Sequence, residues 1–355
     1  MSQHRRRGGR RRPFAVLLAL AVLALFVAAC GSDNKSSGGS GGGGGTTAAG
    51  SGGSGGKKLR VAILLPGSVS DETYNADGQR TADLIKKETG SDVTVTQSVQ
   101  LPNQTDVYSQ FARQGYDLVI GWGGQFTDGA VAASKQFPKT QFLVVNSTAE
   151  NGTNLNSMDE SVEQWQFLGG YAAAKMSKSG TVGWVGGQCF PATAANLNGT
   201  KQGAEYGNKD VKFLSTFTGD FEDPTKGQQA AQAQIDKGAD WIAGNLNNGY
   251  VGLYKAAEGG KAFIITEWAD NHTASPTIGT TVVKKQGRFV LDVVKRVQEG
   301  TAGGKHYQIK LPEDYEPVVV KTDNLPEDVY AETLAVQKKV ASGEIKVERV
   351  EDCPK

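Results

Sequence analysis

The chain of 355 residues has few side chains suited to metal binding or acid–base catalysis, with only three histidines and three cysteines. The metal-binding and redox motifs H-E-x-x-H and C-x-x-C are missing, and so is the phosphate-binding motif G-x-x-x-x-G-K-S/T. The nucleophile motif G-x-S-x-G occurs only within the glycine-rich residues 31–56, which offer no strand or helix to hold a nucleophile. We therefore expect that the protein is not an enzyme and that it holds no metal and no cofactor.

The chain also lacks a strong net charge. It carries 38 Lys+Arg and 37 Asp+Glu, which gives a formal net charge of +1. Six of the arginines lie in residues 5–12, ahead of the first acidic residue, so the rest of the chain carries about −5. Because such a chain has no excess of cations for phosphate groups, we expect no nucleic-acid partner.

One long apolar run, residues 14–29, follows these arginines, and it is shorter than the roughly 20 residues needed to span a bilayer. A positive segment, an apolar run and then small residues are typical of a signal peptide. Residues 27–31 (VAACG) resemble a bacterial lipobox, in which Cys30 is lipidated after cleavage. We predict a lipoprotein signal peptide at 1–29 and a protein held by this lipid on the extracytoplasmic face of the cell membrane. An ordinary membrane anchor is the alternative.

The residues after Cys30 are poor in apolar side chains. Residues 31–56 are mostly glycine with serine, threonine and alanine, and they cannot bury enough apolar surface to offset the entropy lost on ordering. We predict that residues 30–56 form the lipidated cysteine and a disordered Gly/Ser linker. The two cysteines beyond it, Cys189 and Cys353, either form a disulfide in an oxidising compartment or remain unrelated free thiols.

Short apolar runs alternate with helical stretches over the rest of the chain. We expect strands at 59–65, 93–99, 117–121, 141–146, 181–185, 211–217, 241–243 and 262–266. We expect helices at 73–88, 104–114, 127–136, 161–178, 194–208, 223–237 and 250–257, the fourth with a capping box from Ser161 to Gln164. This alternation predicts an α/β fold with parallel sheets. The number of units favours two Rossmann-like, doubly wound lobes over one sheet.

Polar and aromatic residues gather in the loops after the expected strands. Ligands of open α/β sheets bind beyond the carboxyl ends of the strands. The candidate ligand-binding residues in these loops are Asp71, Tyr74, Asn75, Trp122, Phe126, Phe190, Asp220, Phe221, Asn245, Asn247, Trp268 and Asp270. Aromatic faces and Asp or Asn side chains suit a flat ligand with a polar edge. Any single one of them has a simpler role open to it, such as a helix cap for the neighbouring Asp223 or a core position for Phe190.

Six short segments, taken in order, resemble a known family. Its motifs D-x-S-F-N, F-L-A-G-x-x-A-A, V-G-F-V-G-G, G-S-F-x-D-P-x-K-G, D-x-G-A-D and S-G-E-I-K-V are similar to residues 71–75, 167–174, 182–187, 219–227, 236–240 and 342–347. On these residues the chain resembles the basic membrane protein family, whose members include purine nucleoside receptor lipoproteins of ABC importers. The resemblance covers nearly everything from residue 57 onward.

The resemblance implies a type I periplasmic binding protein fold, in which two lobes are joined by a hinge of three crossovers. It implies an N-terminal lobe of residues 57–160 plus 277–304 and a C-terminal lobe of residues 161–276 plus 305–355. In this arrangement residues 277–283 return to the first lobe, together with a helix at about 287–299. The ligand is expected between the lobes, where closure about the hinge encloses it.

The resemblance also implies roles for individual residues. Tyr74 and Phe221 are expected to approach a purine base, with Asp71 and Asn75 beside them, and Lys284 matches a family lysine. The family's G-V-D-S-D-Q loop corresponds to residues 266–271, so Trp268 stands where an aspartate holds the ribose hydroxyls, and Asp270 keeps the second acid. The neighbouring Glu267 could substitute for that aspartate. An indole cannot make the charge-assisted bonds of a carboxylate, which suggests a purine base or a differently posed nucleoside.

We therefore expect a substrate-binding lipoprotein of an ABC importer, whose partners are a purine nucleoside or base, an ABC permease and, through the lipid, the membrane. One alternative keeps the fold but binds a sugar. Another is an exported nucleoside hydrolase that uses Asp71, Asp220 and Asp270 for acid–base chemistry, although no convincing nucleophile accompanies them.

Overall fold

The computed structural model describes residues 57–71 and 73–354, which lie within the compact unit Ser54–Lys355. The expected signal peptide, the lipidation site Cys30 and the expected linker lie outside the described residues. Among the described residues, no helix combines the length and the apolar character needed to cross a membrane.

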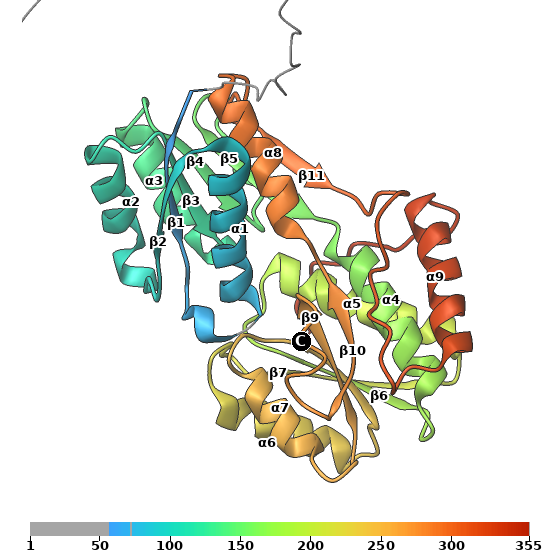
Figure 1. Cartoon of the computed structure of the whole chain (residues 1–355). Coiled ribbons are helices and arrows are strands. Elements are labelled where there is room, and N and C mark those ends of the chain that lie inside the picture. Colours follow the sequence, from blue (N-terminus) through green and yellow to red (C-terminus); the bar gives the residue numbers. More distant parts are fainter. Residues whose placement is uncertain (1–56, 72, 355) are drawn as a thin grey trace, which may run out of the picture. The chain divides into compact units, whose positions relative to one another are not determined.

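The first lobe is built on a six-stranded parallel sheet with the strand order β11-β5-β4-β3-β1-β2 (Figure 1). Its strands are β1 (Arg60–Leu64), β2 (Asp92–Thr96), β3 (Leu118–Trp122), β4 (Gln141–Val145), β5 (Leu155–Glu160) and β11 (His306–Ile309). Helices α1 (Tyr74–Thr89) and α8 (Gln286–Gln298) cover one face, and α2 (Gln104–Arg113) and α3 (Thr127–Gln136) cover the other. Three short 3-10 helices, Val69–Asp71, Leu101–Asn103 and Gly124–Phe126, precede α1, α2 and α3.

Both faces of this sheet are buried, which explains the unbroken apolar run in the sequence of β1. Val61 and Ile63 pack on the side of α1 and α8, whereas Ala62 and Leu64 pack on the side of α2 and α3. When the side chains on both faces of a strand are buried, the strand cannot show the polar–apolar alternation of a half-exposed strand.

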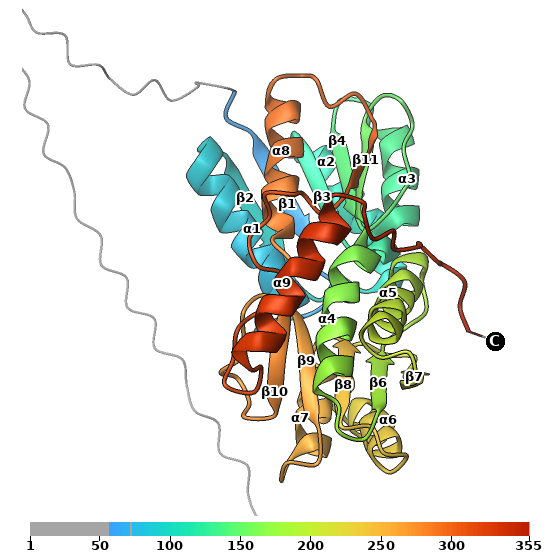
Figure 2. The same cartoon turned by 90° about the vertical axis from the view of Figure 1, so that its right-hand side faces the viewer.

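The second lobe has a five-stranded parallel sheet with the order β10-β9-β8-β6-β7. Its strands are β6 (Thr181–Gly186), β7 (Lys212–Phe217), β8 (Trp241–Asn245), β9 (Phe263–Trp268) and β10 (Ile278–Val283). One face packs against α4 (Val162–Met176), α5 (Pro191–Gly207) and α9 (Glu327–Ala341), and the other against α6 (Pro224–Ile235) and α7 (Tyr250–Ala257). Figure 2 shows α4, α5 and α9 together on their face of this sheet.

Helices α4 and α5 approach so closely that only glycine fits where they cross. A Cβ atom added at Gly203 would lie 1.9 Å from the carbonyl oxygen of Phe167, and one at Gly170 would lie 2.0 Å from that of Thr200. Both distances are far below a van der Waals contact, so the glycines are required by backbone packing. Gly170 on α4 and Gly203 on α5 therefore set the distance between two helices that flank the hinge.

The chain passes between the lobes three times. It passes from β5 into α4, from β10 into α8, and from β11 toward α9. The first and third passages lie side by side, because the Ser161 N–H donates to the Ile309 carbonyl at 2.7 Å. The Ser161 hydroxyl accepts from Gln308 Nε2 at 3.2 Å instead of capping α4, so the expected capping box is not formed.

The two parallel-sheet α/β lobes confirm the expected fold class. Two strands, however, lie in the lobe opposite to the one we expected. The strand expected to return to the first lobe is β10, which pairs with β9 in the second sheet, and β11 pairs with β5 in the first sheet although it was assigned to the second lobe. Both assignments were carried over from the family resemblance, and the strand patterns could not correct them, because such patterns report burial and not the pairing partner. Strand β5 was not predicted, since its sequence LNSMDE lacks an apolar run.

Candidate ligand-binding site

A cavity of about 370 Å³ lies between the two lobes, at the carboxyl ends of strands from both sheets. Its volume is in the range of pockets that hold small molecules. The first lobe contributes Tyr74, the loops after β3 and β4, and the end of β5. The second lobe contributes the start of α5, Phe221, and the ends of β8 and β9.

Seven of the thirteen candidate ligand-binding residues line this cavity. They are Tyr74, Phe190, Phe221, Asn245, Asn247, Trp268 and Lys284. They come from segments up to about two hundred residues apart in sequence. The rule that places sites beyond the carboxyl ends of parallel strands pointed to six of them, and Lys284 was named from the family resemblance. Four of the seven are aromatic, so the cavity offers several ring faces together with a few polar groups.

The first aromatic group joins the two lobes. The ring centres of Tyr74, from the first lobe, and Trp268, from the second, lie 4.7 Å apart at an angle of 52°. The Tyr74 hydroxyl accepts from Asn146 Nδ2 at 3.1 Å, and burial raises the pKa of this phenol well above its ordinary value. Tyr74 therefore stays neutral and keeps its own O–H available as a donor.

The second aromatic group lies entirely on the second lobe. The rings of Phe190, at the start of α5, and Phe221, in the loop after β7, are nearly parallel at 13°, with centres 6.3 Å apart. Both rings line the cavity. Aligned aromatic faces of this kind suit contact with a flat, apolar ring system.

Trp268 is held by a buried ion pair. Lys284 Nζ lies 4.2 Å from the centre of the Trp268 ring and donates to Glu267 Oε2 at 2.6 Å. The side chains of Lys284 and Glu267 are 0% and 1% exposed. Trp268 itself has φ 85, a left-handed conformation that is uncommon for a bulky residue. The ion pair and the cation–π contact together hold this indole at the edge of the cavity.

Glu267 cannot take the place of a ribose-binding aspartate, contrary to the substitution we considered. Besides Lys284, its carboxylate accepts from Gln166 Nε2 at 2.6 Å, from Asn196 Nδ2 at 3.1 Å and from Asn245 Nδ2. Both carboxylate oxygens are therefore engaged inside the protein. Turning Glu267 toward a ligand would leave Lys284 as a buried, unpaired charge.

Two buried acceptor atoms that belong to lining residues have no hydrogen-bond partner among the described residues: Glu160 Oε1 and Asn245 Oδ1. Glu160 is 2% exposed and Asn245 is 8% exposed. Burial raises the pKa of the Glu160 carboxyl to about 8, while the positive charge of Lys284 opposes the rise. Because buried polar atoms are nearly always paired in folded proteins, these two oxygens mark places where a ligand can supply donors.

The other six candidate residues do not line the cavity. Three of them shape or support α1. Asp71 accepts from the backbone N–H groups of Thr73, Asn75 and Ala76 and so caps the helix. The Asn75 side chain bonds to Asp71 and to Gly67, and the Trp122 indole N–H donates to the Tyr74 carbonyl at 3.0 Å. These residues act on the cavity only by positioning Tyr74.

The remaining three have local roles. Phe126 is buried in the first-lobe core against Tyr108. Asp220 accepts from the Glu222 N–H within its own loop, and Asp270 is exposed and bonds to His272. None of Asp71, Asp220 and Asp270, the acids considered for a hydrolase mechanism, lines the cavity. Asp223 caps α6 by accepting from Thr225 and Lys226.

Several lining residues were missed in the sequence. Asn146 directly follows β4 and could have been found by the strand-end rule that located the others. Glu160 ends an unpredicted strand, Asn196 lies within α5, and Arg349 and Glu351 come from the end of the chain. Nothing in the local sequence of these four marks them as parts of a site. Among the described residues, no group of three or more His, Cys, Asp or Glu side chains is arranged to hold a metal ion.

Comparison with known proteins identifies the family of this chain. Residues 58–351 match the family of PnrA-like ABC transporter substrate-binding proteins, named Bmp. The chain is 26% identical to basic membrane protein B of Borreliella burgdorferi, over 81% of this chain and 87% of that protein. It is also 26% identical to the ABC transporter nucleoside-binding protein BmpA of Lactococcus lactis, over 69% and 77%.

Solved structures of solute-binding proteins share the fold. An ABC transporter solute-binding protein from Aeropyrum pernix superimposes with a TM-score of 0.72 at 23% identity, covering 83% of this chain and 94% of the other. One from Conexibacter woesei gives a TM-score of 0.64 at 25% identity, covering 82% and 99%. The chain belongs to the Bmp family of ABC transporter substrate-binding proteins.

Proposed function

We propose that the cavity binds a purine base or purine nucleoside, which the protein delivers unchanged to an ABC permease. The observation that carries the proposal is the convergence of four aromatic side chains with two unpaired buried acceptors in one cavity between the lobes. The rings of Tyr74, Phe190, Phe221 and Trp268 suit the faces of a purine. Stacking of a base on an aromatic side chain contributes about 1–3 kcal/mol.

The open acceptors favour a ligand with hydrogen-bond donors. Glu160 Oε1 and Asn245 Oδ1 can each receive an N–H or O–H group, such as a ring N–H or exocyclic amine of a purine. A ligand without donors would leave both oxygens buried and unpaired at a cost of about 1–3 kcal/mol each. The relative named as a nucleoside-binding protein supports the same class of ligand.

The cations that line the cavity are already paired, which disfavours a phosphorylated ligand. Lys284 is bonded to Glu267, and Arg349 is bonded to Asp159, Glu163 and Glu351. Binding a phosphate would require one of these pairs to break. A neutral base or nucleoside needs no such exchange, so we place nucleotides outside the ligand class.

We propose that the base is the preferred form of the ligand. The family resemblance aligns Trp268 with the ribose-binding aspartate, and Glu267 is fully engaged. A nucleoside then has to place its sugar hydroxyls elsewhere in the cavity, with Glu160 as the available carboxyl group. We further propose that the lipid on Cys30 holds the protein on the extracytoplasmic face of the cell membrane.

The test uses residues 54–355, which contain the compact unit. Thermal unfolding is measured with adenine, guanine, adenosine, guanosine, glucose and galactose. A ligand at 100 times its Kd adds about 2.7 kcal/mol to stability, which corresponds to a shift of several degrees for a chain of this size. A shift with purines alone, with the purine recovered intact by chromatography, supports the proposal. A shift with sugars alone contradicts it, and release of free base from a nucleoside would show a hydrolase.

A further inference from the structure

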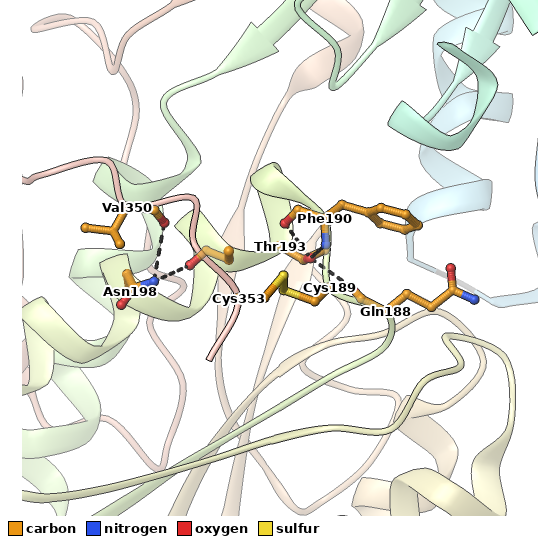
Figure 3. The surroundings of a disulfide bond; sticks show 8 residues. Gln188, Cys189, Phe190, Thr193, Asn198, Val350 and Cys353 are labelled. Atoms are coloured by element: carbon orange, nitrogen blue, oxygen red, sulfur yellow. Dashed lines mark hydrogen bonds between the residues drawn. A yellow bond between two sulfur atoms is a disulfide. The ribbon is translucent and has the colours of Figure 1, made fainter. Parts of the chain in front are cut away.

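The end of the chain forms a strap, residues 348–353, that is held against α5 and the loop before it (Figure 3). Gln202 Oε1 accepts from the Glu348 N–H at 2.9 Å, and Gln202 Nε2 donates to the Glu348 carbonyl at 2.8 Å. Asn198 Nδ2 donates to the Val350 carbonyl at 3.3 Å. Cys353 is joined by a disulfide to Cys189, which is 164 residues away in sequence. The strap is therefore fastened to the second lobe on both sides of Arg349.

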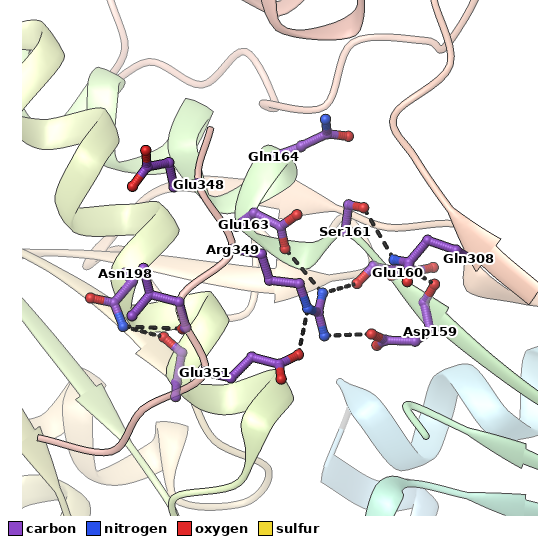
Figure 4. Close-up of polar contacts among 12 residues, drawn as sticks. Asp159, Glu160, Ser161, Glu163, Gln164, Asn198, Gln308, Glu348, Arg349 and Glu351 are labelled. Atoms are coloured by element: carbon purple, nitrogen blue, oxygen red, sulfur yellow. Dashed lines mark hydrogen bonds and ion pairs between the residues drawn. The ribbon is translucent and has the colours of Figure 1, made fainter. Parts of the chain in front are cut away.

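The side chain of Arg349 reaches from this strap to the other lobe (Figure 4). Its Nη1 donates to the Glu160 carbonyl at 2.9 Å and to Glu163 Oε2 at 3.1 Å, and Nη2 is bonded to Asp159. Asp159 and Glu160 end β5 of the first sheet, whereas Glu163 lies in the first turn of α4 in the second lobe. The guanidinium of Arg349 thus bonds to residues on both sides of the first passage, the end of β5 and the start of α4.

The acids that it holds would be costly to leave unpaired. The side chains of Asp159 and Glu163 are 4% and 5% exposed, and Arg349 is their cationic partner among the described residues. Burial raises the pKa of the Asp159 carboxyl to about 7, while Arg349 opposes the rise. A planar guanidinium can serve several acceptors at once, which a lysine ammonium in the same place does less well.

The strap is also part of the ligand site. Arg349 and Glu351, which lie on the strap, line the cavity. Phe190, which follows Cys189 at the other end of the disulfide, lines it as well. The strand end that Arg349 holds carries Glu160, whose Oε1 is one of the two unpaired acceptors. A displaced strap would therefore change one wall of the cavity and free the strand end that carries Glu160.

We propose that the strap is a clamp built into the binding site. In this clamp Arg349 is the positioning residue that ties the end of β5 to α4 at the hinge, and the Cys189–Cys353 disulfide keeps Arg349 in place. The clamp itself does not depend on which ligand binds. Its effect on affinity rests on the proposed function, so the two are measured separately.

The clamp is tested without ligand, by amide hydrogen exchange of residues 54–355. Three N–H groups are the reporters. Those of Ser161 and Leu311 donate across the first and third passages, to the Ile309 carbonyl and to Gln164 Oε1, and that of Gln164 donates to the Ser161 carbonyl within the first passage. Arg349→Ala should speed their exchange about tenfold or more, with α6 and α7 unchanged, because local opening no longer breaks a buried charged pair. Cys189→Ser combined with Cys353→Ser should have the same effect, because the strap that holds Arg349 in place is released. Arg349→Lys should recover part of the protection.

Glu348→Ala is the matched control, because Glu348 bonds to Gln202 through its backbone alone among the described residues, and it should leave exchange unchanged. Should the double serine variant fail to fold, the alanine and lysine variants at position 349 decide. Unchanged exchange of the three reporters in Arg349→Ala would overturn the clamp.

The second measurement gives the dissociation rates of adenine, guanine, adenosine and guanosine. For whichever of these binds the unmodified protein, Arg349→Ala and the double serine variant should raise the rate about tenfold, since affinity changes within one site fall mainly on dissociation. Faster exchange with unchanged dissociation would overturn the role of the clamp in the site. If none of the four purines binds the unmodified protein, the proposed ligand is wrong, while the exchange of the hinge amides still decides the clamp.

Discussion

The ammonium of Lys284 lies 2.6 Å from the Glu267 carboxylate and 4.2 Å from the centre of the Trp268 ring, at the point where β10 leaves the second lobe. Lys284 therefore belongs to the framework that shapes the cavity. The positive charge of Lys284 is paired with the Glu267 carboxylate, so neither group is available to a ligand. This relationship determines which polar groups remain for a ligand.

Removing this lysine should destabilise the fold strongly. Lys284→Met leaves Glu267 as a buried charge without its cation, and we expect a loss of about 3–5 kcal/mol in the free energy of unfolding, measured in urea. Combining it with Glu267→Gln should recover part of the loss. The neighbouring Lys285→Met is the control, because its pair with Glu316 is exposed and should contribute less than about 1 kcal/mol. Equal losses at both lysines would contradict the assigned role.

The ring of Tyr74 should matter more for binding than its hydroxyl. Tyr74→Ala removes an aromatic face, and we expect the purine affinity to fall by about 5- to 150-fold, the equivalent of 1–3 kcal/mol. Tyr74→Phe keeps the ring, loses only the bond with Asn146, and should stay within a few-fold of the unmodified protein. Tyr206→Ala, on the exposed side of α5, should not change calorimetric affinity. An alanine variant that binds as tightly as the phenylalanine variant would exclude stacking on Tyr74.

A carboxylate at position 268 should change the preference between base and nucleoside. Trp268→Asp places an acid where related proteins are expected to hold the ribose, and aspartate tolerates the left-handed backbone at this position better than most residues do. We expect the ratio of guanosine to guanine affinity to rise about 10-fold or more, because charge-assisted bonds to hydroxyls contribute about 1.5–3 kcal/mol.

Trp268→Asn opens the same space as Trp268→Asp but adds no charge, so it should give a smaller rise in the ratio of guanosine to guanine affinity. If Trp268→Asn and Trp268→Asp change the ratio equally, space and not charge governs the preference. If neither variant changes it, the indole does not exclude the sugar.

The stability of the fold should depend on pH through Glu160. Its pKa is about 8 in the folded protein against an ordinary 4.5, so the penalty for burying it is absent below pH 4.5, grows between pH 4.5 and 8, and is complete above pH 8. Glu160→Gln lacks this penalty. Its gain in the free energy of unfolding over the unmodified protein should therefore be about 1–3 kcal/mol larger at pH 8.5 than at pH 5 in urea titrations.

Glu348→Gln, on the strap, should show no such trend. The other buried acids with raised pKa values, Asp77, Asp159 and Glu163, are present in both proteins, so their contributions largely cancel in the comparison. A gain that is the same at pH 5 and pH 8.5 would mean that Glu160 does not titrate in this window.

The glycine contact between α4 and α5 should tolerate no side chain. Gly203→Ala places a methyl group 1.9 Å from the Phe167 carbonyl, so the helices must separate, and we expect a loss of about 1–3 kcal/mol. Gly207→Ala, one turn further along α5, has its nearest atom at 3.0 Å and should cost less. Thermal unfolding measures both, and equal costs would show that the crossing is not close-packed.

The local sequence determined the class of fold and the general location of the site. Buried strands such as 61–64 are apolar without interruption because both faces of a parallel sheet are covered, so the alternation of strands and helices could be read directly. The strand-end rule then found Tyr74, Phe190, Phe221 and Trp268, since every parallel strand brings its carboxyl end to the same edge of a sheet.

The same rule could not separate ligand-facing residues from helix caps. Asp71 caps α1 whereas Tyr74, three residues later, lines the cavity, and the two uses draw on the same residue types in the same loops. The lobe to which β10 and β11 belong was likewise invisible, because apolar content reports burial and not the neighbouring strand.

Tertiary structure alone decided the charges around the site. Glu267 is saturated by groups from α4, α5, β8 and the end of β10, whereas Glu160 keeps one oxygen open. Arg349 meets Asp159 across 190 residues of sequence. Such pairings depend on distances of a few ångströms between distant segments. No local pattern of residues encodes these distances, whereas burial and strand–helix periodicity are properties of each segment itself.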